Sequence, residues 1–383
     1  MSSRVNCRRL GDMAMVVMGQ APPGKDCNKT GQGMPFVKAG EFKDRFPAVV
    51  EWTTNPQKIA RIGDVLLCVV GATAGKLNEG IDCAIGRSLA AIRPDSSKLV
   101  SSYLYRFLQT QVLRLRAQSQ GLAQGVITRE MIQQILLPTP SVSEQRRIAD
   151  ILDKADALRT KRRAAIAQLE ALTLSIFLDM FGDPTTNPRG WRILKIGDLL
   201  ESAAYGTSEK ARASGEFAVL RMNNITRAGD IDLTDLKYME LSGEDRERYI
   251  VKAGDVLFNR TNSAELVGKT AIYRRQDRMA FAGYLIRLRV NESNDPEYLS
   301  AYLNTGYSKR ILRGMCKSII GMANINATQI QAMRIPQPPL ALQRQFAKCV
   351  SQIEKAKVVQ RAWLDTGDSL FSSLQARAFQ GGL

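Results

Sequence analysis

The stretch Ser141-Val142-Ser143-Glu144-Gln145-Arg146-Arg147-Ile148 opens a segment that contains no Pro or Gly as far as Phe181. Ser141 with Glu144 three residues later is a capping-box pattern, in which each side chain satisfies a backbone N–H at a helix start. Apolar residues then recur at spacings of three and four, at Ile148, Leu152, Ala155, Ala165, Leu169, Leu172, Ile176 and Met180. This spacing predicts one long α-helix with a single apolar stripe, roughly 60 Å in length, which needs a second long helix to cover it.

A second helix of this kind is predicted from Leu340 onward. Its entry, Pro336-Gln337-Pro338 followed by Leu342-Gln343-Arg344, resembles Pro138-Thr139-Pro140 followed by Glu144-Gln145-Arg146, although the capping Ser and Glu are missing and Gly367 interrupts the helix. Two similar helices predict two similar units, with the helices packed as an antiparallel pair. We assign these residues to the helix pair or to its partner-facing surface: Ile148, Leu152, Leu169, Ile176, Phe346, Ile353, Trp363 and Leu370.

The regions that precede the helices also repeat. Gly63-Asp64-Val65-Leu66-Leu67 matches Gly254-Asp255-Val256-Leu257-Phe258, and in both copies a Gly-Asp turn leads into an apolar run of strand type. Gly75-Lys76 matches Gly268-Lys269, and Tyr103-Leu104 matches Tyr298-Leu299 within an expected short helix. The order of the matches never breaks along the chain, so we expect an internal duplication.

The expected fold class is α+β, because each globular region mixes short strands, Gly-rich turns and one or two helices. We predict a first globular region over 1–140, a first long helix over 141–183, a second globular region over 184–338 and a second long helix over 339–383. An antiparallel helix pair would place the two regions at opposite ends of a rod, related by an approximate two-fold axis.

The chain has 383 residues and a net charge of +17. Residues 1–140 contain 18 Lys/Arg against 10 Asp/Glu and residues 184–338 contain 23 against 17, whereas the first helix has 7 of each. Most of the excess positive charge therefore lies in the globular regions. Nucleic acid is the partner that this distribution favours, and a surface adapted for solubility is the alternative.

Several classes of chemistry lack their usual residues. The chain contains no histidine, which removes the commonest general base and metal ligand, and its six cysteines form no C-x-x-C pair. No run of eighteen apolar residues occurs, and the first residues lack the apolar core of a signal peptide. We therefore expect reduced thiols, no metal site, no membrane segment and a cytoplasmic protein.

No catalytic motif is complete. Gly71-Ala72-Thr73-Ala74-Gly75-Lys76-Leu77 resembles a phosphate loop, but its glycines are one residue too close and Leu77 stands where Ser or Thr should hold Mg²⁺. No Gly-x-Gly-x-x-Gly cofactor loop is present. A tight turn after a strand is the simpler interpretation of the first motif, and we identify no site for a reaction.

Side chains that contact base edges and phosphates are instead concentrated in turns. For any one of these residues, an ordinary exposed position in a polar loop is the alternative interpretation. As a group they are our candidates for DNA binding: Lys38, Lys43, Arg45, Lys76 and Arg87 in the first region, and Tyr205, Thr207, Lys210, Arg221, Asn223, Asn224, Arg260, Thr261, Asn262 and Lys269 in the second.

With these features the chain resembles the DNA-specificity subunits of type I restriction-modification systems over nearly its whole length. The most specific matches are the Pro-x-Pro and Glu144-Gln145-Arg146 entry to the first helix, its exit at Phe181-Gly182-Asp183-Pro184, and the Tyr205-Gly206-Thr207-Ser208 loop. Leu342, where the family has Glu, is a departure.

The resemblance implies a non-catalytic subunit with two target-recognition domains, each of which reads one half of a split site in double-stranded DNA. It implies that the paired helices fix the separation of the domains and dock two methyltransferase subunits, which translocase-nuclease subunits join. S-adenosylmethionine, ATP and Mg²⁺ would belong to those partners, with no cofactor on this chain. The alternatives are a coiled-coil scaffold without sequence preference and a stand-alone methyltransferase or nuclease.

Overall fold

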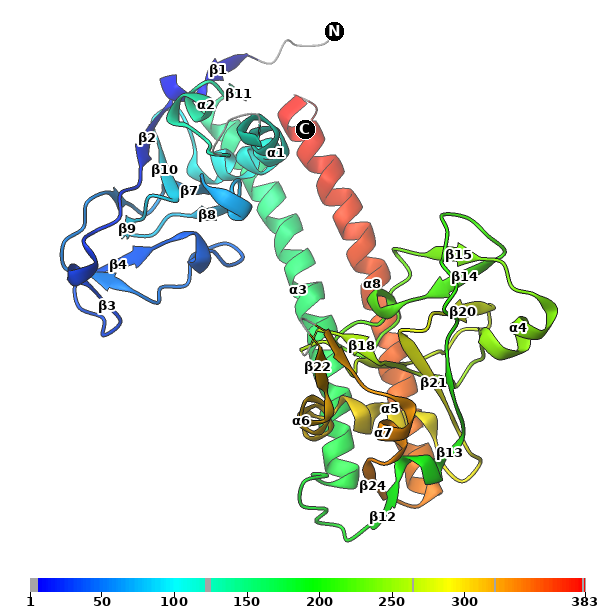
Figure 1. Cartoon of the computed structure of the whole chain (residues 1–383). Coiled ribbons are helices and arrows are strands. Elements are labelled where there is room, and N and C mark those ends of the chain that lie inside the picture. The colour runs from blue at the N-terminus through cyan, green and yellow to red at the C-terminus, as the bar shows by residue number, and fades with distance from the viewer. Residues whose placement is uncertain (1–5, 121–124, 264, 320–321, 381, 383) are drawn as a thin grey trace. The chain divides into compact units, whose positions relative to one another are not determined.

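The computed structural model describes the whole chain except residues 1–5, 121–124, 264, 320–321, 381 and 383. The described residues form two compact units: unit 1 contains residues 1–162 and 363–383, and unit 2 contains residues 163–362. Two long helices, α3 (Val142–Phe181) and α8 (Leu340–Gln380), are each divided between the units, so that one part of each helix belongs to unit 1 and the other part to unit 2 (Figure 1). Unit 1 is therefore built from two parts of the chain that are far apart in sequence.

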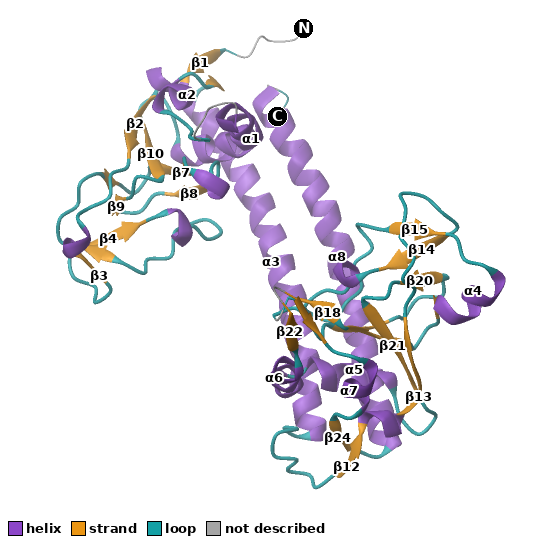
Figure 2. Cartoon of the chain, viewed as in Figure 1, coloured by secondary structure: helices purple, strands orange, loops and turns teal. Residues whose placement is uncertain are grey.

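Unit 1 contains a four-stranded sheet in the order β2-β10-β7-β8, a second sheet in the order β3-β5-β4-β9-β6, and the antiparallel pair β1-β11 (Figure 2). The pairing of β4 with β9 is parallel. The strands are β1 (Cys7–Arg9), β2 (Ala14–Met18), β3 (Cys27–Asn28), β4 (Met34–Val37), β5 (Trp52–Thr53), β6 (Ile59–Ala60), β7 (Val65–Cys68), β8 (Leu77–Glu79), β9 (Cys83–Ile85), β10 (Leu89–Pro94) and β11 (Leu136–Pro138). The helices are α1 (Ser101–Gln120), α2 (Arg129–Gln133), the first part of α3 and the last part of α8.

Unit 2 has a corresponding set of sheets: β13-β21-β17-β19, β15-β14-β20-β16 with a parallel β14-β20 pair, β12-β24, and an additional sheet β18-β23-β22. The strands are β12 (Arg192–Lys195), β13 (Leu200–Tyr205), β14 (Phe217–Leu220), β15 (Lys237–Met239), β16 (Ile250–Val251), β17 (Val256–Asn259), β18 (Thr261–Asn262), β19 (Thr270–Ile272), β20 (Met279–Phe281), β21 (Leu285–Val290), β22 (Lys317–Ile319), β23 (Met322–Asn324) and β24 (Arg334–Gln337). The helices are the last part of α3, α4 (Gly243–Tyr249), α5 (Pro296–Asn304), α6 (Gly306–Met315), α7 (Ala327–Gln331) and the first part of α8.

The apolar runs that follow the Gly-Asp turns are strands buried on both faces. In β7, Val65 and Leu67 pack in the core that contains α1, whereas Leu66 and Cys68 point the other way into the core of the second sheet. This division follows from the two-residue period of a strand. A continuous apolar run therefore marks a strand between two layers, and Cys68 is a buried core residue.

Two buried glutamines, Gln145 and Gln343, occupy matching places near the start of the two long helices. The side-chain amide of Gln145 donates to the carbonyl of Pro140 (3.0 Å), and that of Gln343 donates to the carbonyl of Pro338 (2.8 Å). Each glutamine also accepts a backbone N–H from the globular region of its unit, from Val100 in unit 1 and from Asp295 in unit 2. Gln145 and Gln343 thus each join the start of a long helix to the globular region of the same unit.

The start of α3 differs in one detail from the predicted capping box. The Ser141 hydroxyl accepts a hydrogen bond from the backbone N–H of Glu144 (3.3 Å), as expected. The Glu144 carboxylate, however, pairs with the guanidinium of Arg147 (2.6 Å), which lies one turn further along the same exposed face. The cap is therefore single, because a nearby cation competes for the carboxylate.

The expected short helix after the main sheet also differs between the units. In unit 1 it is the continuous α1, whereas in unit 2 the backbone of Thr305 is extended and separates α5 from α6. The Thr305 hydroxyl accepts the backbone N–H of Ser308 (3.1 Å) and so caps the start of α6. A Thr-Gly pair, Thr305-Gly306, provides this break.

Aromatic side chains join the long helices to the globular core in each unit. In unit 2, Phe177 and Phe181 of α3 pack against Tyr298 of α5 and Phe346 of α8, with ring centroids 4.8 to 5.8 Å apart. In unit 1, Phe379 of α8 packs on Tyr103 and Phe107 of α1 at 5.4 and 5.2 Å. Within each unit the two helix segments run in opposite directions, since the end of one lies beside the start of the other.

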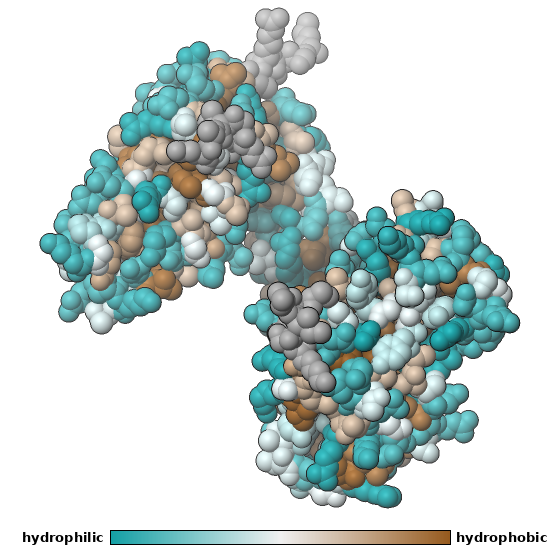
Figure 3. Space-filling model, viewed as in Figure 1, coloured by the Kyte–Doolittle hydropathy of each residue, from teal (hydrophilic) through white to brown (hydrophobic). Residues whose placement is uncertain are grey.

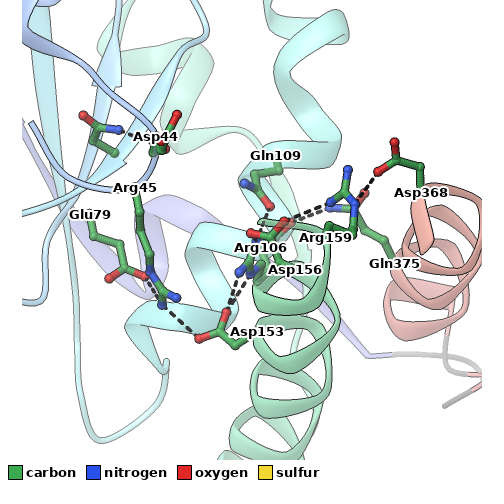
Figure 4. Close-up of polar contacts among 11 residues, drawn as sticks. Asp44, Arg45, Glu79, Arg106, Gln109, Asp153, Asp156, Arg159, Asp368 and Gln375 are labelled. Atoms are coloured by element: carbon green, nitrogen blue, oxygen red, sulfur yellow. Dashed lines mark hydrogen bonds and ion pairs between the residues drawn. The ribbon is translucent and has the colours of Figure 1, made fainter. Parts of the chain in front are cut away.

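A buried arginine links α1 to both long helices within unit 1. Arg106 is 1% exposed, and its guanidinium pairs with Asp153 (2.7 Å) and Asp156 (2.9 Å) of α3 (Figure 4). The Gln375 amide on α8 donates to the Arg106 carbonyl (3.2 Å). Two carboxylates accompany the buried cation, and each also pairs with a second arginine, Asp153 with Arg45 and Asp156 with Arg159. These pairs offset part of the cost of removing the Arg106 guanidinium from water.

By length and composition alone, α3 would qualify as a membrane-crossing helix, since an 18-residue window within it is apolar enough to span a membrane. The sequence had led us to expect no such segment. Only 11% of that window is buried within the chain. Phe177 and Phe181 near the end of the helix are buried in the core of unit 2, so part of the apolar surface of this window packs against other protein residues. Hydrophilic residues cover much of the visible surface of both globular regions (Figure 3).

Replacing Phe177 by alanine should reduce the free energy of unfolding by about 3–5 kcal/mol, because this side chain is 1% exposed and contacts three other rings. The matched control is Leu178→Ala, at a position that is 41% exposed on the same helix, and its effect should stay within about 0.5 kcal/mol. Denaturant unfolding of the full chain measures both values. Equal effects of the two substitutions would contradict this packing.

Candidate nucleic-acid interface

A hollow of about 750 Å³ in unit 2 collects residues from turns that are distant in sequence. It lies where β13 and β14 end and β21 begins, next to β18 and β23. Six of the ten predicted residues of this region line it: Tyr205, Thr207, Lys210, Arg221, Arg260 and Thr261. The lining also includes Ser208, Glu209, Lys237, Tyr284 and Asn324.

Arg260 is held in the hollow by an aromatic ring and an amide. Its guanidinium carbon lies 4.8 Å from the centroid of the Tyr205 ring, and its Nη2 donates to Oδ1 of Asn324 (3.0 Å). The Tyr205 hydroxyl in turn accepts the backbone N–H of Ala327 (2.9 Å). The buried Nε of Arg260 has no hydrogen-bond acceptor among the described residues. The ring of Tyr205 and the amide of Asn324 thus restrict the orientation of the Arg260 guanidinium.

The glycine of the Tyr205-Gly206-Thr207 loop is required by a close approach of two backbones. A Cβ atom at Gly206 would lie 2.3 Å from the carbonyl oxygen of Ala282 and 2.4 Å from that of Phe281. Thr207 is buried beneath the loop, where its hydroxyl accepts the N–H of Glu209 (3.1 Å). Thr207 therefore shapes the loop, and Lys210 is exposed at its edge.

Arg221 enters the hollow from the turn that follows β14. Its Nη2 donates to the Asp235 carboxylate (2.8 Å), and its buried Nε has no acceptor among the described residues. Asn224, three residues later, is buried, and its amide donates to the carbonyls of Asp232 (2.8 Å) and Asp235 (3.0 Å). Asn224 thus holds the loop, whereas Asn223 beside it is exposed.

The remaining predicted residues of unit 2 lie outside the lining of the hollow. The ammonium of Lys269 donates to the carbonyls of Met222 (2.8 Å) and Ile225. Burial lowers the pKa of this ammonium, and the nearby charge of Arg227 lowers it further. Asn262 is half-buried in β18, and its Oδ1 accepts the N–H of Ser263 (2.9 Å). Lys269 is therefore engaged within the domain.

The five predicted residues of unit 1 fall into two groups. Lys43, Lys76 and Arg87 are exposed. Lys38 pairs with Glu51, a hydrogen bond that raises the pKa of its ammonium, and Arg45 is engaged with carboxylates. Among the described residues of unit 1, no hydrogen bond or ion pair joins any two of these five side chains.

The helix residues are also divided. Ile148, Leu152, Phe346 and Ile353 are buried, and Leu169 and Ile176 are half-buried. Trp363 and Leu370, in contrast, are 59% and 55% exposed. With Leu158 and Gly367 they line an apolar hollow of about 400 Å³ on the helical surface of unit 1. Unit 1 therefore buries only part of the apolar stripe of α8 and leaves Trp363 and Leu370 exposed to solvent.

The unpredicted residues of the unit 2 hollow include three that lie outside the loops the sequence had singled out and whose side chains can donate hydrogen bonds: Lys237, Tyr284 and Asn324. Tyr284 is 49% exposed. It directly follows Gly283, and an aromatic residue in a glycine turn is the sequence signal that could have identified it as a candidate. Lys237 and Asn324 are single polar residues at strand ends, and only the pairing of β15 with β14 and of β18 with β23 brings them to the hollow.

Comparison with known proteins identifies the family. The family model described as "Type I restriction modification DNA specificity domain" matches residues 3–171 and again residues 188–360. A Methanocaldococcus jannaschii protein described as a type I restriction enzyme MjaX specificity subunit is 33% identical over 171 residues, and this match covers 44% of our chain but only 40% of that relative. The EcoKI specificity subunit of Escherichia coli K12 is 25% identical over 339 residues, which cover 82% of the chain and 72% of the relative.

A solved structure shows the same fold. The crystal structure of a type I restriction-modification S subunit from M. genitalium superposes with a TM-score of 0.62 at 14% identity, covering 99% of this chain and 97% of that one. The family model accounts for both globular regions and for most of both long helices. The chain therefore belongs to the type I restriction-modification DNA specificity domain family.

Proposed function

We propose that this chain is the non-catalytic subunit that selects the DNA target of a type I restriction-modification complex. In this proposal residues 1–140 and 184–338 are the two target-recognition domains, and each reads one half of a bipartite site. The observation that supports it best is the unit 2 hollow, in which Arg260, Arg221, Tyr205 and Lys210 meet in a domain of this family. These are the side-chain types that bind base edges and phosphates.

The candidate DNA contacts differ in how free their side chains are. Lys43, Lys76, Arg87, Lys210 and Asn223 are exposed and suit contact with phosphates or bases. Arg221 and Arg260 are oriented by internal partners, and each keeps one Nε without an acceptor. Thr207, Asn224 and Lys269 do not face outward; their side chains form hydrogen bonds with the backbone of the loops that present these residues.

We further propose that residues 141–183 and 339–383 act as spacer helices, paired in the antiparallel sense, which fix the separation of the half-sites and dock two methyltransferase subunits. The exposed apolar surface around Trp363, Leu370 and Leu158 suits such docking, because a large apolar patch is unfavourable in water. S-adenosylmethionine, ATP and Mg²⁺ would act on the methyltransferase and translocase-nuclease partners, in a cytoplasmic complex.

Binding of the assembled complex to DNA should be sequence-specific and strongly salt-dependent, because the excess positive charge lies in the globular regions. For roughly six to ten phosphate contacts, affinity should fall by about 10³–10⁵ between about 50 and 200 mM salt. Fluorescence anisotropy with matched and scrambled duplexes at several salt concentrations measures both properties. Equal affinity for the two duplexes would favour a scaffold without sequence preference.

The substitution Arg260→Lys should relax the half-site assigned to residues 184–338 and leave the other half unchanged. Lysine keeps the charge but loses the planar stack on Tyr205 and the fork that binds Asn324. Mapping of methylated bases in a host that expresses the complex is the measurement, with exposed Lys252→Gln as the control that should change neither half. Altered preference at both halves would refute independent reading.

Residues 1–190 should form a two-fold dimer that directs methylation to an interrupted palindrome. Unit 1 normally takes residues 363–383 into its core, including Phe371 and Phe379. In the dimer, residues 163–181 of the second copy would take that place. By the alignment of Gln145 with Gln343, Phe181 then corresponds to Phe379 and Glu170 to Asp368.

The mass of the truncated complex with its methyltransferase, together with its methylation pattern, tests this exchange. A folded fragment that stays monomeric and leaves DNA unmethylated would show that the two halves are not interchangeable.

A further inference from the structure

The loop that supplies Arg221 to the unit 2 hollow is anchored at its other end. After β14, Arg221 precedes a 3₁₀ turn, η6 (Met222–Asn224), and the chain then forms a tight loop closed by a bridge between Ile225 and Ile231. Within the loop, the Thr226 N–H donates to the Asp230 carbonyl (2.9 Å), and the Asp230 N–H donates to the Thr226 hydroxyl (3.0 Å). Asp230 thus stands at the tip of a rigid loop.

The Asp230 carboxylate is held by two cations of α8. Its oxygens accept from Nζ of Lys357 (2.7 Å) and Nη2 of Arg361 (2.5 Å). The Asp230 side chain is 10% exposed and that of Lys357 only 3%. Lys357 also pairs with Glu354 (2.9 Å), and Arg361 pairs with Glu170 of α3 (3.8 Å), so the node contains three carboxylates and two cations. Burial by itself raises the pKa of Asp230, but the two cations outweigh it, so its pKa lies below the usual range.

The loop tip also fits closely against the rest of unit 2. Gly229 has a φ of 86°, and a Cβ atom there would lie 2.8 Å from the Asn304 amide nitrogen and 2.9 Å from the Thr270 carbonyl oxygen. A side chain at this position would therefore push the loop away from β19 and α5. Lys269 contacts the start of the same loop through the Met222 and Ile225 carbonyls. The segment from Arg221 to Asp230 is thus fixed at both ends.

Unit 1 uses the corresponding loop in the same way, with the charges reversed. Lys38 precedes the 3₁₀ turn η3 (Ala39–Glu41) after β4, and a bridge between Phe42 and Pro47 closes the loop. Arg45 within that loop pairs with Asp153 of α3 (2.9 Å) and Glu79 of β8 (2.6 Å), as Figure 4 shows. The hydrogen bond to Glu79, followed by that to Asp153, raises the pKa of Arg45. The loop after the parallel strand is therefore anchored to a long helix in both units.

A buried ion pair of this kind adds little net stability, because desolvation offsets most of its Coulomb energy. It does restrict the partners to one geometry. The loop tip could have been covered by apolar residues if stability were its only role. The ion pairs of Asp230 with Lys357 and Arg361 instead hold the loop in one position relative to α8.

We propose that Asp230 is a positioning residue for target recognition: by holding the loop 221–235 on Lys357 and Arg361 of α8, it orients Arg221 in the hollow and so determines which bases the second half-site accepts. In unit 1, Asp153 does the same for the first half-site through Arg45. This inference rests on the function proposed above and concerns residues that do not themselves touch DNA.

The experiment compares Asp230→Asn with Asp232→Asn in the complete methyltransferase complex. The Asp232 carboxylate accepts hydrogen bonds from Thr234 of its own loop, at 2.9 and 2.7 Å, and no hydrogen bond or ion pair of the described structure joins it to α8. The hydrogen bonds from Thr234 lower its pKa, and the charge of Arg361 on α8, which acts on it only at longer range, lowers it further. Methylation is mapped genome-wide, and the rate at the matched site is compared with the rate at sites that carry one wrong base. For Asp230→Asn this ratio should fall about tenfold in the second half-site, which corresponds to about 1.4 kcal/mol of discrimination. It should stay unchanged in the first half-site.

Two further variants separate positioning from a merely structural role. Asp230→Glu keeps the charge and should restore much of the discrimination. Asp153→Asn should relax only the first half-site. Because Asp153 also pairs with the buried Arg106, its matched control is Asp156→Asn, which removes the other partner of Arg106 but leaves the Arg45–Asp153 pair and should not relax the first half-site. If Asp230→Asn fails to fold because it leaves the Lys357 ammonium buried with one partner fewer, the double variant Asp230→Asn with Lys357→Met removes that charge. The double variant should fold and still show relaxed reading of the second half-site.

An unchanged methylation pattern in folded Asp230→Asn, or equal relaxation of both half-sites, would overturn the inference. Equal methylation of matched and mismatched sites by the wild-type complex would instead contradict the proposed function itself. The two failures are therefore distinguishable in one data set.

Discussion

The apolar stripes of α3 and α8 are the constraint on which the remaining structure depends. Each helix has about forty residues, and each compact unit covers only about half of that length. Both helices must therefore be shared, and each unit takes the first part of one helix and the last part of the other. Unit 1 thus obtains Phe371 and Phe379 from the C-terminal helix, and unit 2 obtains Phe177 and Phe181 from the central one.

Much of this organisation could be predicted because it depends on regular spacing. An uninterrupted stripe from Ile148 to Met180 predicts a helix whatever its surroundings, and matching Gly-Asp turns predict equivalent strands. The family and the function class followed from the same motifs, and the comparisons confirm both. Where local competition decides, the prediction was wrong, because Arg147 takes the Glu144 carboxylate that the capping box requires. The short helix predicted around Tyr298 is present as α5, which ends at Asn304, whereas its counterpart in unit 1 continues.

The candidate interface was harder to predict, because the sequence does not show which basic residues have internal partners. Arg45 resembles any exposed loop cation, yet one of its partners, Asp153, lies 108 residues away. Lys269 follows a Gly in a turn, but it binds carbonyls 44 and 47 residues earlier in the chain. In contrast, Tyr205, Lys210, Arg221 and Arg260 come together because they end or follow strands of neighbouring sheets. Strand pairing, which one sequence does not reveal, also adds Lys237 and Asn324.

The discontinuity of unit 1 has a consequence for how the chain folds during synthesis. Residues 163–362 form a contiguous segment, so unit 2 has all its parts once they have left the ribosome. Unit 1 begins to emerge before unit 2, but its core stays open on the side of Phe371 and Phe379 until the second part of α8 has been made. Such long-range closure is slow and leaves apolar surface exposed in the meantime. The domain made first is thus completed last, and a nascent chain has a window in which Tyr103 and Phe107 are accessible to chaperones or to a helix from another copy.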